Sequence, residues 1–387
     1  MSTWHRIRKL LLTWFCAFVV ALMMLFQSAL VTAQQTRGEA IDWLYQVEQL
    51  VPDQGESVRL AAARRSLLRV LSRTTGLASV PRSSIVAKAL EAPDRYYTKY
   101  VYFDPRQLNP VQRGLIDNAS EGVNSGLAVR FDFQPAAIKK LTRDARLPTW
   151  WSRRPLTMIW MVLDEPSDRT VVDHGALGIR NALDAAAQQR GLPVMLPLMD
   201  LQDSVAVNPA VIWGKFTDVL DEANQRYNAS QYLLGRFSVQ EILGERLYTG
   251  EWLVRSSDGE ASQFFRGVDL NNLVRAGIDM ATRHVLDQHL VFTNVPRQHD
   301  LVVRGVAGIR AYASLLDYLQ SLEFIDSVMV LGLHADALTL RINSVATDLQ
   351  LRSLLIDDGQ FDRAPQTVQL PLPESATSLE FIWLGAS

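Results

Sequence analysis

The stretch Leu147-Pro-Thr-Trp-Trp-Ser-Arg-Arg-Pro155 divides the chain into parts with different patterns, and it decides how the fold is read. Two prolines bracket two tryptophans and two arginines, and proline disfavours the interior of helices and sheets. We interpret residues 148–155 as a linker whose aromatic rings cover the joint between two domains. Aromatic and arginine side chains are also common interface anchors, so an exposed interaction surface is the alternative. Its residues would be Trp150, Trp151, Arg153 and Arg154.

The residues before this boundary, 38–147, predict an N-terminal α+β domain with the element order β-α-α-β-β-α. Its first helix ends at Gly76, a residue that adopts a left-handed cap easily. Apolar and polar residues alternate between Leu127 and Phe133, which is typical of a strand with one solvated face. Strands are expected at about 43–48, 97–103 and 127–133, and helices at about 57–75, 83–90 and 136–146, with a loop over 104–126.

Residues 156–292 predict a central α/β domain with the order β-α-β-α-β-β-β-α. Its first strand is continuously apolar, as the centre of a sheet requires. Strands are expected at 156–163, 192–196, 232–239, 247–255 and 262–266. Helices are expected at 176–190, after Pro209, where Phe216 would be buried, and at 270–290. This order is similar to the α/β modules of the curli secretion lipoprotein, penicillin-binding-protein activator lipoproteins and the translocation protein TolB. That resemblance is at the level of the fold and implies action by protein contact.

Residues 298–387 predict a C-terminal domain with the order β-α-β-β-α-β, a ferredoxin-like sandwich. Strands are expected at 301–306, 325–333, 337–342 and 379–384, and helices at 308–322 and 346–356. Polar residues and prolines over 358–377 predict a loop. The chain is therefore expected to hold three small modules.

The first 33 residues have the pattern of a secretory signal peptide. A basic start at residues 6–9 precedes an apolar run over 10–26 and a small-residue end at Val31-Thr-Ala33. We expect cleavage after Ala33 and a periplasmic location for the mature chain. The alternative is an uncleaved membrane anchor, because roughly 20 apolar residues suffice to span a bilayer.

Charge and cysteine content restrict the class of partner. The chain has 39 basic and 41 acidic residues, and loss of the three basic residues in the predicted signal leaves a net charge of −5. This balance does not favour nucleic acid as a partner. The single cysteine, Cys16, lies in the apolar run, so the mature chain is expected to hold no disulfide. We expect membrane attachment only through an uncleaved signal.

Motifs for catalysis are absent from the sequence. It contains no glycine-rich phosphate loop, no Gly-x-Ser-x-Gly and no His-Glu-x-x-His. His284 and His289 are separated by about 140° around a helix and are poorly placed to share a metal. We therefore expect no cofactor, no metal and no catalytic residue.

A row of arginines marks the first predicted helix. Arg65, Arg69 and Arg73 follow one another at i+4, and Arg64 lies beside them. Like charges at this spacing repel and are commonly relieved by a partner. One interpretation is a solvated face, or a face paired with acids from another element. The other is a binding site for anionic lipid, cell-wall polymer or an acidic protein.

Several segments of the chain carry a resemblance, and they are Ala62-Ala-Arg-Arg-Ser-Leu-Leu-Arg-Val-Leu-Ser-Arg-Thr-Thr-Gly76, residues 127–133, Leu141, and Ala145-Arg-Leu-Pro148 with Trp150 and Arg154-Pro155. Together they resemble an uncharacterised bacterial envelope family, domain of unknown function 2066. Trp151 departs from the family, which has glycine after the tryptophan. The resemblance implies an envelope location and this modular architecture, and it supplies no catalytic site.

Two functions of different class follow. The first is a non-enzymatic envelope adaptor or binding protein, favoured by the missing catalytic motifs. Its partner would be an envelope protein or an anionic cell-wall or lipid surface. The second is a hydrolase or transferase that acts on envelope polymers, with a site assembled at a domain joint from residues far apart in the sequence.

Overall fold

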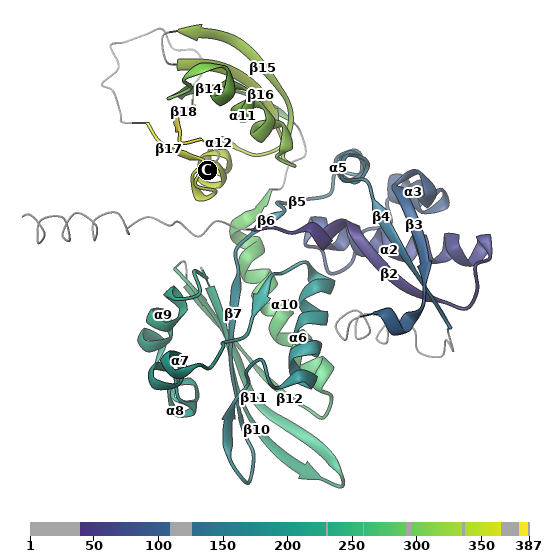
Figure 1. The fold of residues 1–387 in the computed structure, drawn as a ribbon, viewed down its shortest axis with the longest axis vertical. Helices are drawn as coiled ribbons and strands as arrows, with labels where there is room; N and C mark the ends of the chain where they lie inside the picture. Colours follow the sequence, from purple (N-terminus) through teal and green to yellow (C-terminus); the bar gives the residue numbers. More distant parts are fainter. Residues whose placement is uncertain are drawn as a thin grey trace, which may run out of the picture.

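A computed structural model describes residues 39–108, 126–229, 231–257, 259–291, 296–334, 337–364 and 379–385. The fold is mixed α and β, with helices packed on several small sheets (Figure 1). The predicted signal peptide and most of the loop predicted over 104–126 lie outside the described residues. Among the helices in the described ranges, none has the length and apolarity needed to cross a membrane.

The N-terminal part is a three-stranded antiparallel sheet covered by helices. The strand order is β2-β4-β3, with β2 at Gln46–Val51, β3 at Tyr97–Phe103 and β4 at Leu127–Phe133. The helices are α2 (Glu56–Thr75), α3 (Ser84–Glu91) and α5 (Pro135–Asp144). Their apolar faces bury Val129 and Phe131 of the sheet together with Leu67 and Leu71 of α2, as the alternation and the helical spacing predict.

The first predicted strand, 43–48, is displaced. Residues Asp42–Tyr45 form a 3-10 turn instead, and β2 begins only at Gln46. The guanidinium of Arg73 explains the difference, because its Nη1 donates to the main-chain oxygens of Trp43 (3.0 Å) and Gln46 (2.8 Å). A contact from a distant helix thus overrides the local alternation.

The central part is a sheet with helices on both faces (Figure 1). The main strand order is β12 (Gly259–Gly267), β11 (Glu245–Ser256), β10 (Gln231–Ile242), β7 (Thr157–Asp164) and β8 (Arg169–Val171), with β9 (Val194–Met195) also paired to β7. Ile159 and Met161 of β7 pack towards α6 (Leu177–Arg190) and α10 (Leu270–His289). Trp160 of β7 packs on the opposite face. Both faces of β7 are covered, which explains its continuous apolar sequence.

The opposite face carries three short helices, where the sequence predicts one. They are α7 (Leu201–Ala206), α8 (Pro209–Trp213) and α9 (Thr217–Gln225). The chain leaves the helix at Gly214, and Lys215 adopts a left-handed backbone with φ 54°. The Nζ of Lys215 bonds Glu251 of β11 at 3.0 Å, which holds this turn. Phe216 is consequently 56% exposed, so its predicted burial is wrong.

The C-terminal part is a five-stranded sheet with two helices. The strand order is β15 (Ile325–His334), β16 (Ala337–Ser344), β14 (Arg297–Arg304), β18 (Leu379–Trp383) and β17 (Phe361–Arg363), and the helices are α11 (Gly308–Ser321) and α12 (Asp348–Asp357). A ferredoxin-like sandwich has an antiparallel sheet. Here β18 runs parallel to β14, because the unpredicted strand β17 comes before it and pairs with it in the antiparallel sense.

The boundary segment 148–155 is folded, with four of its eight residues buried and the other four half-buried. Its short strand β5 (Thr149–Trp150) pairs with β13 (Leu290–Val291), and β6 (Arg153–Arg154) pairs with β1 (Glu39–Ala40). The Trp150 side chain belongs to the central hydrophobic core. The next side chain, Trp151, belongs to the C-terminal core, where its ring meets Phe324 edge to face at 5.5 Å. The two tryptophans therefore anchor different cores and cannot form an exposed surface.

Candidate functional site

Helices α2 and α6 meet at their C-terminal ends. Each ends in a glycine with a left-handed backbone, Gly76 at φ 70° and Gly191 at φ 79°. The last carbonyl groups of a helix have no partner within the helix and carry its negative dipole end. Two such ends side by side need hydrogen-bond donors with positive charge, and buried arginines supply them.

Arg73, in the last turn of α2, reaches the end of α6. Its Nε donates to the main-chain oxygen of Gln188 at 2.8 Å, in addition to the bonds to Trp43 and Gln46. The guanidinium carbon lies 5.3 Å from the centre of the Trp43 ring. The side chain is buried, so Arg73 fastens α2 to α6 and to the start of the N-terminal sheet.

Arg154, in the boundary segment, also bonds the ends of both helices. We call this meeting of α2 and α6, with Arg73 and Arg154, the joint. Its Nη2 donates to the main-chain oxygen of Arg73 at 2.7 Å, and its Nη1 donates to that of Gly191. Its Nε bonds the Trp151 oxygen at 2.9 Å, and the guanidinium stacks on the Trp150 ring at 3.6 Å. With only 1% of its surface exposed, Arg154 ties both helix ends to the boundary segment.

The hydrogen bonds of Arg73 and Arg154 at this joint all go to main-chain oxygens. Within the described residues, neither Arg73 nor Arg154 forms a salt bridge. Burial, together with the proximity of Arg69 and Arg154, lowers the pKa of Arg73 to about 9, and Glu48 acts in the opposite direction. Burial lowers the pKa of Arg154 to about 9, against the opposing effect of Glu323 and Tyr45. Arginine therefore stays protonated here at neutral pH. A third arginine, Arg190, donates to the Gly76 oxygen at 3.2 Å and pairs with Asp279 at 2.9 Å.

Half of the predicted interaction surface is thus internal. The buried members are Arg73, Trp150, Trp151 and Arg154. Their side chains fill cores or satisfy main-chain oxygens, so they are not available to an external partner. The physical reason is the encounter of α2 and α6, which brings together residues more than 100 positions apart in the sequence.

The other four predicted residues lie closer to solvent. The Nε of Arg64 donates to the Leu90 oxygen at 2.8 Å, and Arg65 makes only a long contact of 3.5 Å with Gln49. Arg153 pairs with Asp358 at 2.9 Å, so its charge is already neutralised inside the fold. The fourth residue, Arg69, faces a pocket.

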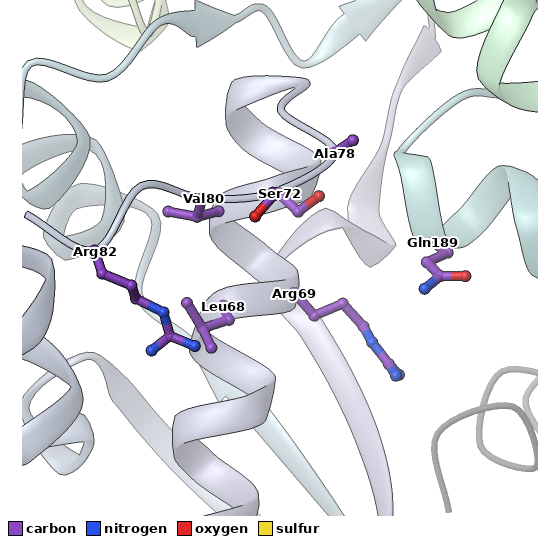
Figure 2. Close-up of a pocket in the computed structure, with 8 residues that line it drawn as sticks. Leu68, Arg69, Ser72, Ala78, Val80, Arg82 and Gln189 are labelled. Carbon is purple, nitrogen blue, oxygen red and sulfur yellow. The ribbon is translucent and has the colours of Figure 1, made fainter.

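This pocket, of about 260 Å³, lies between α2, the segment after it and the last turn of α6. Figure 2 shows Arg69 and Arg82 on opposite sides of Leu68, with Gln189 on the side of Arg69. We call it the joint pocket, and its lining residues are Leu68, Arg69, Ser72, Ala78, Ser79, Val80, Arg82 and Gln189. The sequence predicts only Arg69 among them. Arg82 lies in an irregular segment just before Ser83, the cap residue of α3, and no periodic pattern marks it.

The chemistry of the joint pocket is that of an anion site. Among the described residues, no carboxylate forms a salt bridge with Arg69 or Arg82. Partial burial lowers the pKa of Arg69, and the neighbouring Arg65 lowers it further. An arginine keeps its charge under such conditions, so two guanidinium groups remain available. The lining includes no carboxylate, histidine or cysteine that could act as a general base.

The histidine most suggestive of catalysis lies elsewhere and is inaccessible. The Nδ1 of His299 lies 2.5 Å from Asp348 at the start of α12, and the His299 side chain is buried. Asp300, its neighbour in the sequence, pairs instead with Arg341 at 2.7 Å. A buried histidine with this partner joins β14 to α12, which is a structural role. In the part of the chain that the structure describes, no three His, Cys, Asp or Glu side chains gather in a way that could hold a metal.

Comparison with known proteins shows that one part of the chain is similar to a family. Residues 39–151 match a family model described as Domain of unknown function (DUF8605). This match corrects the resemblance to domain of unknown function 2066, which rested on an amphipathic helix and an alternating strand that many folds share. The matched region contains seven of the eight residues of the joint pocket, and Gln189 lies outside it.

Other comparisons add little. No curated protein matches the chain. One solved structure, titled "Crystal structure of uncharacterized protein", is 12% identical over 35% of this chain and 90% of that chain, with a TM-score of 0.16. A TM-score this low supports no conclusion about the fold.

Proposed function

We propose that the protein is a non-enzymatic binding protein, an adaptor that holds an anionic group of a partner in the joint pocket. The observation that carries the proposal is the pair Arg69 and Arg82, which line one cavity and form no salt bridge within the described residues. Unpaired guanidinium groups are the preferred protein donors for carboxylate and phosphate. Arg73 and Arg154 bond the ends of α2 and α6, the two helices that contribute to the pocket lining.

We propose further that the adaptor works in the cell envelope. The basic start, apolar run and small residues of positions 1–33 support export through a signal cleaved after Ala33. The partner would then be an envelope protein or an anionic cell-wall or lipid surface, and not nucleic acid. The element order that the sequence predicts for residues 156–292 is similar to that of the curli secretion lipoprotein and TolB modules, which supports a role in protein contact, although the structure adds strand β8 and two further short helices to that order. The C-terminal sheet would be a variant of the ferredoxin-like sandwich with its last strand reversed.

An enzyme acting on envelope polymers is the second candidate. It draws support from the place of the joint pocket, because Gln189 comes from α6 and the other lining residues come from the N-terminal part. A hydrolase or transferase also needs a nucleophile or a general base beside its substrate. Among the described residues that line the pocket, Ser72 and Ser79 carry hydroxyl groups, but no carboxylate or histidine lines the pocket to activate them. Binding is therefore the function that the geometry supports better.

In-cell crosslinking tests the adaptor proposal. A photoreactive amino acid at exposed Ser84, beside the pocket, should capture a partner, whereas the same group at exposed Ile309 in α11 should not capture it. Changing both Arg69 and Arg82 to Gln should abolish the capture at position 84. Fractionation of the same cells should recover the captured complex from the periplasm. Capture that survives the double change, or a complex found in the cytoplasm, would contradict the proposal.

A further inference from the structure

We infer that the joint pocket takes a peptide carboxylate, either the free C-terminus of a protein chain or the side chain of Asp or Glu. The inference rests on the proposed function and names the chemistry of its ligand. The features that single out a peptide are the number of charges, the apolar wall and the free main-chain groups around the pocket.

The charges fit a single carboxylate bound by either guanidinium, because Figure 2 shows Leu68 between the two groups. Among the described residues, the lining contains two cations, Arg69 and Arg82, and no acid that would repel the ligand. A guanidinium binds a carboxylate through two parallel N–H donors, which fixes the plane of the anion. A chain of phosphates or an extended acidic polymer would require a longer row of cations. The next arginine along α2, Arg65, lies outside the pocket.

The size and the apolar wall fit a single residue. The volume of about 260 Å³ falls below the range of roughly 300–1,000 Å³ that drug-sized ligands need. Leu68, Ala78 and Val80 supply an apolar wall beside the guanidinium groups. A short aliphatic side chain next to a carboxylate would cover this wall, whereas an inorganic anion would leave it in water.

The segment after α2 offers groups for a peptide main chain. Ala78 and Ser79 are exposed, and hydrogen bonds among the described residues do not use their N–H or C=O groups. The side-chain amide of Gln189 lies at the same pocket and can both donate and accept. Recognition of an extended peptide commonly combines such main-chain bonds with a pocket for one side chain or terminus.

Binding of peptide pools to the full mature chain tests this inference. Three pools of hexapeptides are compared, each labelled at the N-terminus and randomised at the last three positions. The first has a free C-terminal carboxylate and no acidic side chain, the second is its amidated equivalent, and the third is amidated with one internal Glu. Fluorescence polarisation should show binding of the first or the third pool at least about tenfold tighter than that of the second, as loss of a charge-assisted hydrogen bond implies.

Matched variants identify the site. Arg69→Gln with Arg82→Gln should remove the preference for carboxylate while the melting temperature stays close to that of the parent. Arg310→Gln, an exposed change on α11, should leave peptide binding unchanged. Equal binding of all pools, a preference that survives the double change, or binding only of inorganic phosphate or phosphatidylglycerol vesicles would overturn the inference. If crosslinking at Ser84 still captures a partner in an Arg69-dependent and Arg82-dependent manner, the adaptor function stands and only the carboxylate ligand is wrong.

Discussion

The Nη2 of Arg154 lies 2.7 Å from the main-chain oxygen of Arg73, so a residue of the boundary segment closes the last turn of α2. The same guanidinium donates to Gly191 at the end of α6. Three segments distant in the sequence therefore share one buried cation. The acceptors of its hydrogen bonds are main-chain oxygens, which stay in place when a side chain is substituted. Replacement of Arg154 therefore measures how much free energy of unfolding is lost with this one cation.

Replacement of Arg154 by Met should destabilise the protein strongly. Methionine fills a similar volume, but the main-chain oxygens of Trp151, Arg73 and Gly191 would lose their donor. A hydrogen bond to a charged group contributes about 1.5–3 kcal/mol, so a loss of about 3 kcal/mol or more is expected. Urea unfolding followed by tryptophan fluorescence measures it. Arg310→Met, an exposed control, should change the free energy of unfolding by less than about 0.5 kcal/mol.

Two glycines at opposite ends of α6 provide a second test. Gly191 has φ 79°, and a Cβ there would collide with the Nη1 of Arg154. The left-handed backbone alone costs a residue with a Cβ about 1–2 kcal/mol, so Gly191→Ala should lose at least that amount. Gly178, near the start of the same helix, has open space around it, and Gly178→Ala should gain about 0.5 kcal/mol. Equal effects of the two changes in thermal unfolding would show that the joint does not depend on this close approach.

Three of the five arginines of α2, Arg65, Arg69 and Arg73, should separate into two classes. Arg73→Gln removes bonds to three main-chain oxygens and should lower stability by about 2 kcal/mol or more. Arg65→Gln and Arg69→Gln should each stay within about 0.5 kcal/mol, since neither forms a salt bridge within the described residues. The Arg69 change relieves repulsion by Arg65 and should raise the melting temperature slightly. A large loss from Arg69→Gln would mean that this residue also holds the fold.

The elements that sequence reasoning located well are those with local causes. Helix α2 ends at Gly76 because a left-handed cap favours glycine, and strands β3 and β4 have the predicted bounds because their own side chains alternate or are aromatic. The missed elements have distant causes. The 3-10 turn at Asp42–Tyr45 depends on Arg73, and the short strands β8 and β17 gain their stability from pairing with β7 and β18.

The residues of the candidate site also divide into those that a local pattern predicts and those that depend on distant parts of the chain. Spacing along α2 singles out Arg69 and Arg73 together, but it cannot tell the one that lines a pocket from the one that is buried. The approach of α6 decides this difference, and nothing in the sequence of α2 encodes it. Arg82 and Gln189 join the pocket from an irregular segment and from another helix, so no single pattern could have grouped them.

Acid should weaken the attachment of α7 to α9. Arg226 bonds Asp200 at 2.5 Å and Asp203 at 2.7 Å, and its hydrogen bonds hold the pKa of Asp200 well below the usual value of 3.8. The stabilisation is present above pH 3.8 and is lost as the pH falls below it, because the unfolded chain then binds a proton that the folded chain excludes. Melting temperatures between about pH 6 and pH 3 should fall less steeply for Arg226→Gln than for the parent. Arg310→Gln should keep the steep slope, and a parallel decline of all three proteins would contradict this account.

The boundary segment should resist proteolysis, although its sequence predicts a linker between two domains. Arg153 pairs with Asp358 at 2.9 Å and lies over the Tyr318 ring, and Arg154 is buried. A protease must pull several residues into an extended conformation, which here would expose Trp150 and Trp151 from two cores. Trypsin should therefore leave the bond after Arg153 intact in the native protein and cut it once urea unfolds the chain, as mass spectrometry of the fragments would show. A native fragment that ends at Arg153 would mean that the segment opens on its own and that the buried arginines do not lock the joint.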